Sequence, residues 1–103
     1  MSQSEFILPD WPAPANVRAF ATMRAGGISQ GAYAELNLGD HVGDAQDAVG
    51  ANRTRLSESA GLPAEPCWLQ QVHGTQGVEA AAGSRGAEAD WSWAQQPGEV
   101  CAV

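Results

Sequence analysis

The segment Trp68-Leu69-Gln70-Gln71-Val72-His73-Gly74-Thr75 is a short apolar run that ends in a histidine and then a glycine. This pattern, together with the preceding cysteine, predicts a strand over Cys67 to Val72 that is followed by a turn. A histidine at a strand end places either a metal ligand or a general base at the edge of a cleft. The spacing leaves both roles open, because a single histidine does not define a site.

Short apolar runs elsewhere predict more strands. They cover Val17 to Arg24, Val78 to Ala82, Asp90 to Trp93 and Glu99 to Val103. The proline-rich residues 5–16 predict an extended lead-in, because proline breaks helices. The apolar side chains of this lead-in are expected to pack against the body of the protein, and they are Phe6, Leu8 and Trp11.

The clearest helix is predicted over Asp44 to Ala60. Asp44 is the expected N-cap, and Asp47 adds negative charge to the first turn. Gly61 and Pro63 then supply the usual signals that end a helix. One face repeats at intervals of three to four residues, and it consists of Ala45, Val49, Asn52, Leu56 and Ala60.

Length and composition indicate one small globular domain. The chain has 103 residues, of which 44% are hydrophobic. No apolar run approaches the roughly 20 residues of a membrane span, and residues 1–5 lack the features of a signal peptide. We therefore expect a soluble cytoplasmic protein without a membrane partner.

The charge balance argues against a nucleic-acid partner. The formal net charge is −7, with five arginines and no lysine, and the arginines are too scattered to form a basic face. A small anion held by one or two arginines fits this composition better. Arg24 is the candidate, because it ends a predicted strand beside the glycine-rich segment Ala25 to Gly31. The alternative for Arg24 is a surface ion pair.

The cysteines and histidines do not complete a site by themselves. Cys67 and Cys101 form no Cys-x-x-Cys pair, and both are expected to be reduced, buried thiols. On an extended strand Cys67 and His73 would lie about 20 Å apart, which is too far for a direct dyad. Zinc needs three or four ligands, and His41 and His73 are the only imidazoles. His41, in a glycine–aspartate turn, is expected to be a surface or loop-bracing residue.

Five segments, taken in order, resemble one family. The chain resembles the multicopper polyphenol oxidase or laccase-like family of the bacterial YfiH type, from about Val17 to Val103. Members of this family are now mostly described as purine nucleoside phosphorylases with adenosine deaminase activity. The segments are Thr22 to Gly31, Leu36 to Asp44, Asn52-Arg53, Trp68 to Thr75 and Ala89-Asp90.

The resemblance implies an α+β fold with mixed β-sheets flanked by helices. It also implies that residues 1–103 are the N-terminal part of a single domain, truncated at Val103. His73 corresponds to the first ligand of a zinc site, with copper as the alternative metal, and it would be the catalytic residue. The other ligands of the family, a cysteine and a histidine, would lie beyond Val103. Two residues depart from the family pattern: Trp91 replaces a small residue, and Gly77 replaces a β-branched one.

The function implied by the resemblance is purine nucleoside phosphorolysis. Adenosine, inosine or guanosine would react with phosphate to give the base and ribose 1-phosphate, and adenosine would also be deaminated. Arg24 would hold phosphate, and Asn37 and Gln71 would contact ribose or base. The alternatives are a copper-dependent oxidase of phenols and a chain that is catalytically inactive. Self-association or a missing C-terminal part would complete the site.

Overall fold

The computed structural model describes residues 6–103, so Glu5 of the predicted lead-in lies outside the described residues. The chain divides into two units, which are described separately below. Unit 1 holds residues 6–38 and 44–60, and unit 2 holds residues 39–43 and 61–103. Within residues 6–103, no helix has the length and apolar character needed to cross a membrane.

Unit 1 is built on helix α1 (Gln46–Ala60), which confirms the predicted helix apart from its start. The first helical bond runs from the Val49 N–H to the Ala45 carbonyl oxygen (3.1 Å), so Ala45 is the N-cap. The prediction that Asp44 is the N-cap is therefore wrong by one residue. The Asp44 carboxylate accepts the Ala45 N–H and is otherwise held by the loop.

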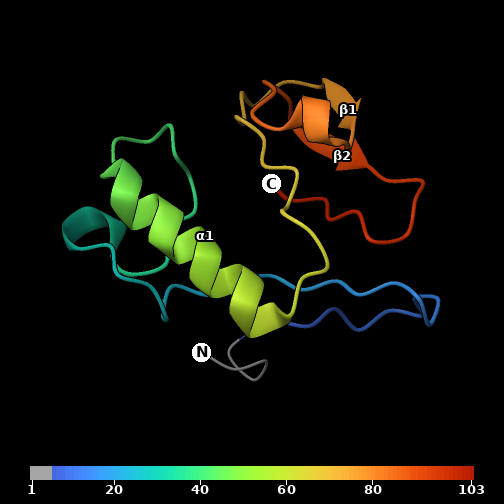
Figure 1. Cartoon of the computed structure of the whole chain (residues 1–103), viewed down its shortest axis with the longest axis horizontal. Helices are drawn as coiled ribbons and strands as arrows, with labels where there is room; N and C mark the ends of the chain where they lie inside the picture. The colour runs from blue at the N-terminus through green and yellow to red at the C-terminus, as the bar shows by residue number, and fades with distance from the viewer. Residues whose placement is uncertain (1–5) are drawn as a thin grey trace. The chain divides into compact units, whose positions relative to one another are not determined.

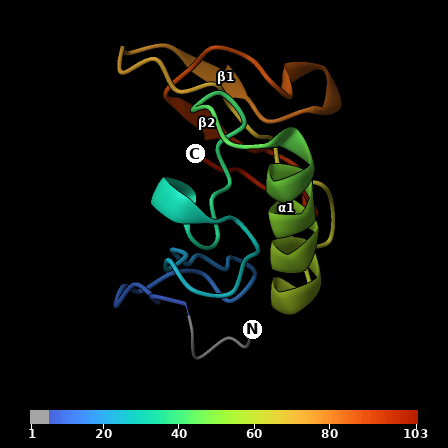
Figure 2. The same cartoon turned by 90° about the vertical axis from the view of Figure 1, so that its left-hand side faces the viewer.

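One face of α1 is buried, as its periodicity predicted. The four residues from Val49 onward on the predicted face are buried, whereas Ala45 precedes the helix and is exposed. Residues 24–38, which include the short 3-10 turn η2 (Gly31–Tyr33), run along α1 (Figure 2). The carbonyl of Leu38 accepts two bonds from the Arg53 guanidinium, at 2.9 and 2.7 Å. The burial of α1 in unit 1 is thus achieved largely against an irregular loop.

The predicted strand over Val17 to Arg24 is not formed. Residues 6–24 double back on themselves (Figure 1), but they share a single antiparallel bridge, between Ile7 and Ala21. A longer ladder would require N–H donors from residues 8–14, and three of those residues are prolines. The lack of these donors explains why the pairing stops at one bridge.

The apolar side chains of the lead-in are only partly buried. Phe6 is buried and stacks on Phe20, with ring centroids 4.5 Å apart. Leu8 and Trp11 remain 65% and 54% exposed, so the prediction that they pack against the body is wrong within unit 1. Phe6 is the buried residue of the three, and its ring is the one that stacks on an aromatic side chain of the returning segment.

Unit 2 contains a parallel pair of strands, β1 (Gly77–Glu79) and β2 (Trp91–Trp93), in which Gly77 pairs with Trp91. These strands confirm the short strand near Trp91 and shorten the one predicted over Val78 to Ala82. That strand ends at Glu79, and a 3-10 turn, η3 (Ala82–Ser84), follows it. A small core lies beneath the pair, made by Cys67, Leu69, Ala80 and Ala89.

The strands predicted over Cys67 to Val72 and Glu99 to Val103 are wrong as continuous elements. Cys67 makes one parallel bridge to Cys101, and Gln70 makes another to Glu88. Because each bridge involves a different partner segment, no two successive residues share a ladder. The segment that leads to His73 is extended chain held at two points.

Candidate functional site

His73 stands in an unusual backbone conformation. Its φ is +58°, in the left-handed region, and its side chain is exposed. This region costs a residue with a Cβ about 1–2 kcal/mol, so the surrounding structure must hold His73 there.

The carboxylate of Asp90 supplies that hold. Its Oδ1 accepts the Val72 N–H at 3.1 Å, and its Oδ2 accepts the Gly74 N–H at 2.7 Å. The two bonds grip the backbone immediately before and after His73. A Cβ on Gly74 would lie 3.3 Å from Oδ2, so glycine gives the carboxylate room at this position.

Asp90 is itself anchored to unit 2 by its backbone. Its N–H donates to the Gln76 carbonyl at 2.9 Å, and the preceding residue, Ala89, donates to the Gln70 carbonyl at 3.1 Å. The His73 turn is therefore fastened at both ends to the segment that leads into β2. Gln71, the other predicted site residue of unit 2, is exposed on the same segment.

Gly77 and Trp91, the two residues expected to depart from the family pattern, are in contact. A Cβ on Gly77 would lie 2.3 Å from the Trp91 ring, so the indole occupies the space that a side chain at position 77 would need. The Trp91 Nε1–H also donates to the Thr75 carbonyl at 3.1 Å. The Trp91 ring therefore packs against Gly77 while its indole N–H holds the chain that follows His73.

Arg24 of unit 1 lies across the loop from Leu36. Its carbonyl accepts the Leu36 N–H at 2.9 Å, and its Nε donates to the Ala34 carbonyl at 3.0 Å. The side chain is exposed, and it forms no ion pair within residues 6–103. The hydrogen bond to Ala34 orients the guanidinium through Nε, so its two terminal nitrogens are available to an anion.

Asn37 takes part in a polar network between the loop and α1. Its side-chain Nδ2 donates to Asp44 Oδ2 at 3.2 Å, and its backbone carbonyl accepts the Asn52 Nδ2–H at 2.8 Å. The Asn37 side-chain amide, which is predicted to contact ribose or base, already donates a hydrogen bond to Asp44.

Asn52 is the centre of the network, and sequence reasoning gave it no such role. Its side chain is fully buried; Oδ1 accepts the Ile28 N–H and Nδ2 donates to Ser29 Oγ, both at 2.8 Å. The signal that could have found it was its position, since an asparagine on the buried face of a helix needs partners. Asp90 was likewise quoted in a motif without a role.

The Asp44 carboxylate is stabilised in its ionised form. The hydrogen bond from the Ser29 hydroxyl (2.5 Å) lowers the pKa of Asp44 below the ordinary value of 3.8. Desolvation opposes this shift, and the N–H groups of Asn37 and Ala45 support it. Because the pKa is lower in the folded state, Asp44 stabilises the fold above about pH 3.8, and this contribution is lost as the pH falls through the folded pKa.

We therefore expect the free energy of unfolding to depend less on pH in Asp44→Asn than in the wild type under acidic conditions. The variant lacks the carboxylate whose protonation weakens the fold, so its urea midpoint should fall less than that of the wild type below about pH 3.8. Asp47→Asn is the control, since the Asp47 carboxylate accepts the Ala48 N–H instead. Equal acid slopes for wild type and Asp44→Asn would contradict the assignment.

The residues that could hold a metal do not form a complete centre. Within residues 6–103, no three His, Cys, Asp or Glu side chains are grouped as metal ligands would be. His41 is exposed, with Nδ1 3.6 Å from Asp40 Oδ1. The exposed imidazole of His73 has the chemistry of one zinc ligand, but the described part of the chain groups no further donors with it. The zinc site stays a prediction.

The cysteines differ from each other. Both are free thiols; Cys67 is buried as predicted, whereas Cys101 is exposed, so the prediction for Cys101 is wrong. Cys101 makes the single backbone bridge to Cys67, and its own side chain is exposed.

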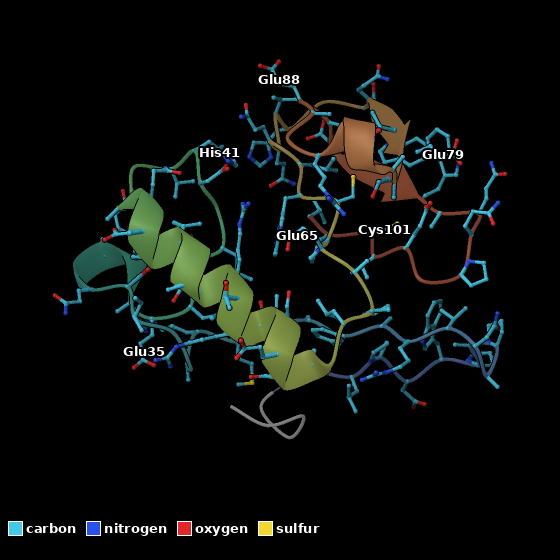
Figure 3. The ribbon with its side chains drawn as sticks, viewed as in Figure 1. Glu35, His41, Glu65, Glu79, Glu88 and Cys101 are labelled. Atoms are coloured by element: carbon cyan, nitrogen blue, oxygen red, sulfur yellow. The ribbon has the colours of Figure 1, made fainter. Side chains whose placement is uncertain are left out.

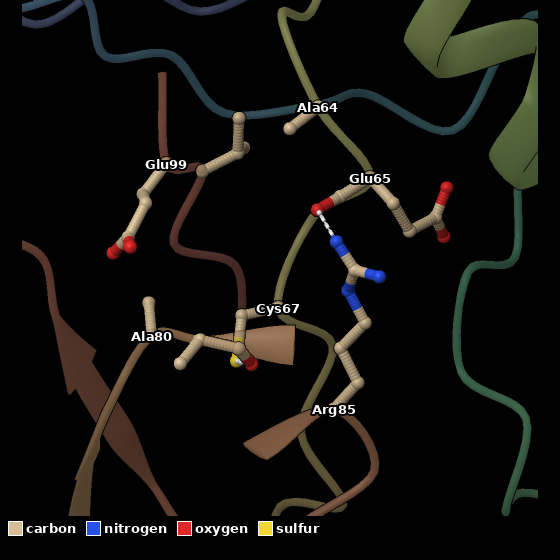
Figure 4. A pocket seen from close by; sticks show the side chains of 8 residues that line it. Ala64, Glu65, Cys67, Ala80, Arg85 and Glu99 are labelled. Carbon is tan, nitrogen blue, oxygen red and sulfur yellow. Dashed lines mark hydrogen bonds between the residues drawn. The ribbon is translucent and has the colours of Figure 1, made fainter. Parts of the chain in front are cut away.

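A small pocket in unit 2 lies apart from the predicted residues (Figure 4). It has a volume of about 200 Å³, below the roughly 300 Å³ at which small-molecule sites begin. Arg85 spans it by donating to the Glu65 carbonyl at 3.1 Å. We do not assign the pocket to a nucleoside. Its lining residues are Ala64, Glu65, Cys67, Ala80, Ala81, Arg85, Glu99 and Val100.

The predicted site residues therefore fall into two pairs. Arg24 and Asn37 belong to the loop of unit 1, and Gln71 and His73 belong to the turn of unit 2. The family model described as multi-copper polyphenol oxidoreductase laccase matches residues 18–103, which include all four. The chain belongs to this family. The resemblance drawn from the motifs is thereby confirmed.

Curated relatives in this laccase-like family carry enzyme names. A purine nucleoside phosphorylase of Pseudomonas aeruginosa is 51% identical over 98 residues, which are 95% of this chain and 39% of that protein. The purine nucleoside phosphorylase YfiH of Escherichia coli is 44% identical over 101 residues, 97% of this chain and 42% of its own. The chain thus spans about two fifths of the length of these relatives.

Solved structures of similar proteins confirm the α+β fold. A Neisseria meningitidis protein is 47% identical and superposes with a TM-score of 0.84, over 96% of this chain and 40% of its own. YlmD from Geobacillus stearothermophilus is 26% identical, also with a TM-score of 0.84, over 98% of this chain and 42% of its own. Helix α1 and the β1–β2 pair are the part of this fold that the laccase-like chain contains.

Proposed function

We propose that this laccase-like chain is part of a purine nucleoside phosphorylase of the cytoplasm. The observation that carries the proposal is its 51% identity, over 95% of the chain, to a protein named for that activity. The exposed His73 turn and the exposed Arg24 supply chemistry that fits such a reaction.

In the proposed reaction a phosphate oxygen attacks C1′ of the ribose of adenosine, inosine or guanosine. The bond between C1′ and the base nitrogen breaks, the base leaves with its electron pair and gains a proton, and ribose 1-phosphate forms. Positive charge develops on the ribose, so a well-placed phosphate stabilises the transition state. Arg24 would hold the phosphate, and Asn37 and Gln71 would contact ribose or base.

The metal and the second activity are also proposals. His73 would act as one ligand of zinc, with copper as the alternative. A bound zinc would supply Lewis acidity for adenosine deamination. The family description itself favours one rival, the copper-dependent oxidation of phenols, and a catalytically inactive chain is the other.

One comparison of products separates these functions. The chain and the full-length protein that carries it are incubated with each nucleoside, with and without phosphate, and separately with a phenol and copper. We expect phosphate-dependent release of base and ribose 1-phosphate in the full-length protein. Base release without phosphate, or oxidation of the phenol alone, would contradict the proposal; activity in neither assay would favour the inactive alternative.

Arg24→Ala should raise the KM for phosphate by about tenfold or more, because an arginine–phosphate contact is a charge-assisted hydrogen bond. The measurement is the phosphate dependence of inosine phosphorolysis. Arg18→Ala removes another exposed arginine of unit 1 and is the matched control. An unchanged phosphate KM in Arg24→Ala would remove Arg24 from the site.

A further inference from the structure

We propose that Asp90 is a positioning residue for His73. The Asp90 carboxylate binds the backbone on both sides of His73 and thereby sets the direction of the imidazole. The clamp itself is independent of the proposed function, whereas its effect on catalysis rests on that function. No role for Asp90 follows from the motif in which it occurs.

The geometry requires both carboxylate oxygens. Oδ1 takes the N–H before His73 and Oδ2 takes the N–H after it, at 3.1 and 2.7 Å. A left-handed residue between two such anchors cannot rotate to negative φ without breaking at least one of the bonds. The direction of the Cα–Cβ bond, and hence the region that the imidazole can reach, depends on this φ.

Asparagine cannot replace the carboxylate at this position. Its amide offers one acceptor oxygen, and its NH₂ group would face an N–H that also donates. Asp90→Asn therefore keeps the size of the side chain and loses one of the two anchors. This makes Asp90→Asn the most informative substitution.

A charge-matched control lies two residues earlier. Glu88 is exposed and points outward from its loop (Figure 3), and its backbone bridges to Gln70. Glu88→Gln removes one negative charge from the same loop without touching the clamp. Any effect of net charge alone would appear in both variants.

The direct test is amide hydrogen exchange, measured by NMR on the chain. In the wild type, the Val72 and Gly74 amides should exchange more slowly than those of their exposed neighbours Gln71 and Thr75. In Asp90→Asn at least one of the two protected amides should exchange about tenfold faster, as expected for loss of a hydrogen bond to a charged group. The amides of α1 report whether the variant is folded.

A second readout follows the conformation of His73. A positive φ brings the amide proton close to Hα of the same residue and gives a strong intraresidue NOE. We expect this NOE at His73 to weaken in Asp90→Asn and to persist in Glu88→Gln. Unchanged exchange rates or an unchanged NOE in folded Asp90→Asn would overturn the proposal. Unprotected Val72 and Gly74 amides in the wild type would also overturn it, even where the variant fails to fold.

Kinetics separate the clamp from the proposed function. In the full-length protein, Asp90→Asn should lower kcat for phosphorolysis about tenfold and change the phosphate KM little, because phosphate is assigned to Arg24. A wild type without phosphorolysis would defeat the proposed function while the exchange data still decide the clamp. A rise in phosphate KM with unchanged kcat would contradict a positioning role for Asp90.

Discussion

Gly27→Ala is expected to destabilise unit 1 by about 3 kcal/mol, which is at the upper end for overpacking. A Cβ at this position would lie 2.3 Å from the Glu35 carbonyl oxygen and 2.6 Å from the Leu36 Cα. Both of these atoms belong to the backbone, so the clash cannot be relieved by turning a side chain. It would also lie 2.6 Å from Asn52 Oδ1, which holds the loop against α1.

Urea unfolding of the chain measures this effect, and Gly50→Ala is its matched control. Gly50 lies inside α1, and a Cβ there would meet no atom within 4 Å. Alanine should therefore stabilise the helix by about 0.5–1 kcal/mol, opposite in sign to the effect at Gly27. Similar midpoints for Gly27→Ala and the wild type would show that the loop can move away from the glycine.

Asn52→Ala is the second large effect, with an expected loss of about 3 kcal/mol. The substitution removes a fully buried side-chain amide that bonds Ile28, Ser29 and Asn37. It leaves the Ile28 N–H without its acceptor. A donor left without its partner in a partly buried position costs about 1–3 kcal/mol, and the lost packing of the buried Asn52 side chain adds to it.

The control for Asn52→Ala is Thr54→Ala, measured in the same urea titration. Thr54 is exposed on α1, and its hydroxyl bonds the Gly50 carbonyl of its own helix, at 3.1 Å. Because alanine has the higher helix propensity, this change should be nearly neutral. A loss at Asn52 no larger than the change at Thr54 would mean that the network contributes little to stability.

The two substitutions probe one structural unit that also carries a predicted site residue. Asn52 bonds the backbone of Asn37, and Gly27 lets the Glu35–Leu36 backbone approach, while Arg24 receives the Leu36 N–H. A weakened network should therefore loosen the loop that presents Arg24. We expect Asn52→Ala to raise the phosphate KM as a secondary effect, smaller than that of Arg24→Ala.

Local sequence signals predicted the elements whose formation depends on residues that are close together along the chain. Helix α1 was placed within two residues because its buried face repeats every three to four positions and its end is marked by glycine and proline. The short strand at Trp91 was also found. The strand predicted over Val17 to Arg24 failed because apolar content does not reveal that the facing segment is rich in proline and lacks donors.

The sequence by itself determined the family, the helix and the histidine at the end of residues 68–73, because ordered motifs and helical periodicity can be read along one chain. Only the tertiary structure decided that Asp90 grips the backbone around His73 and that Asn52 holds the Gly27 loop. The bonds of Asp90 span 16 and 18 residues, and that of Asn52 to Ile28 spans 24. Such pairings depend on how distant segments pack, and no local pattern of residues specifies them.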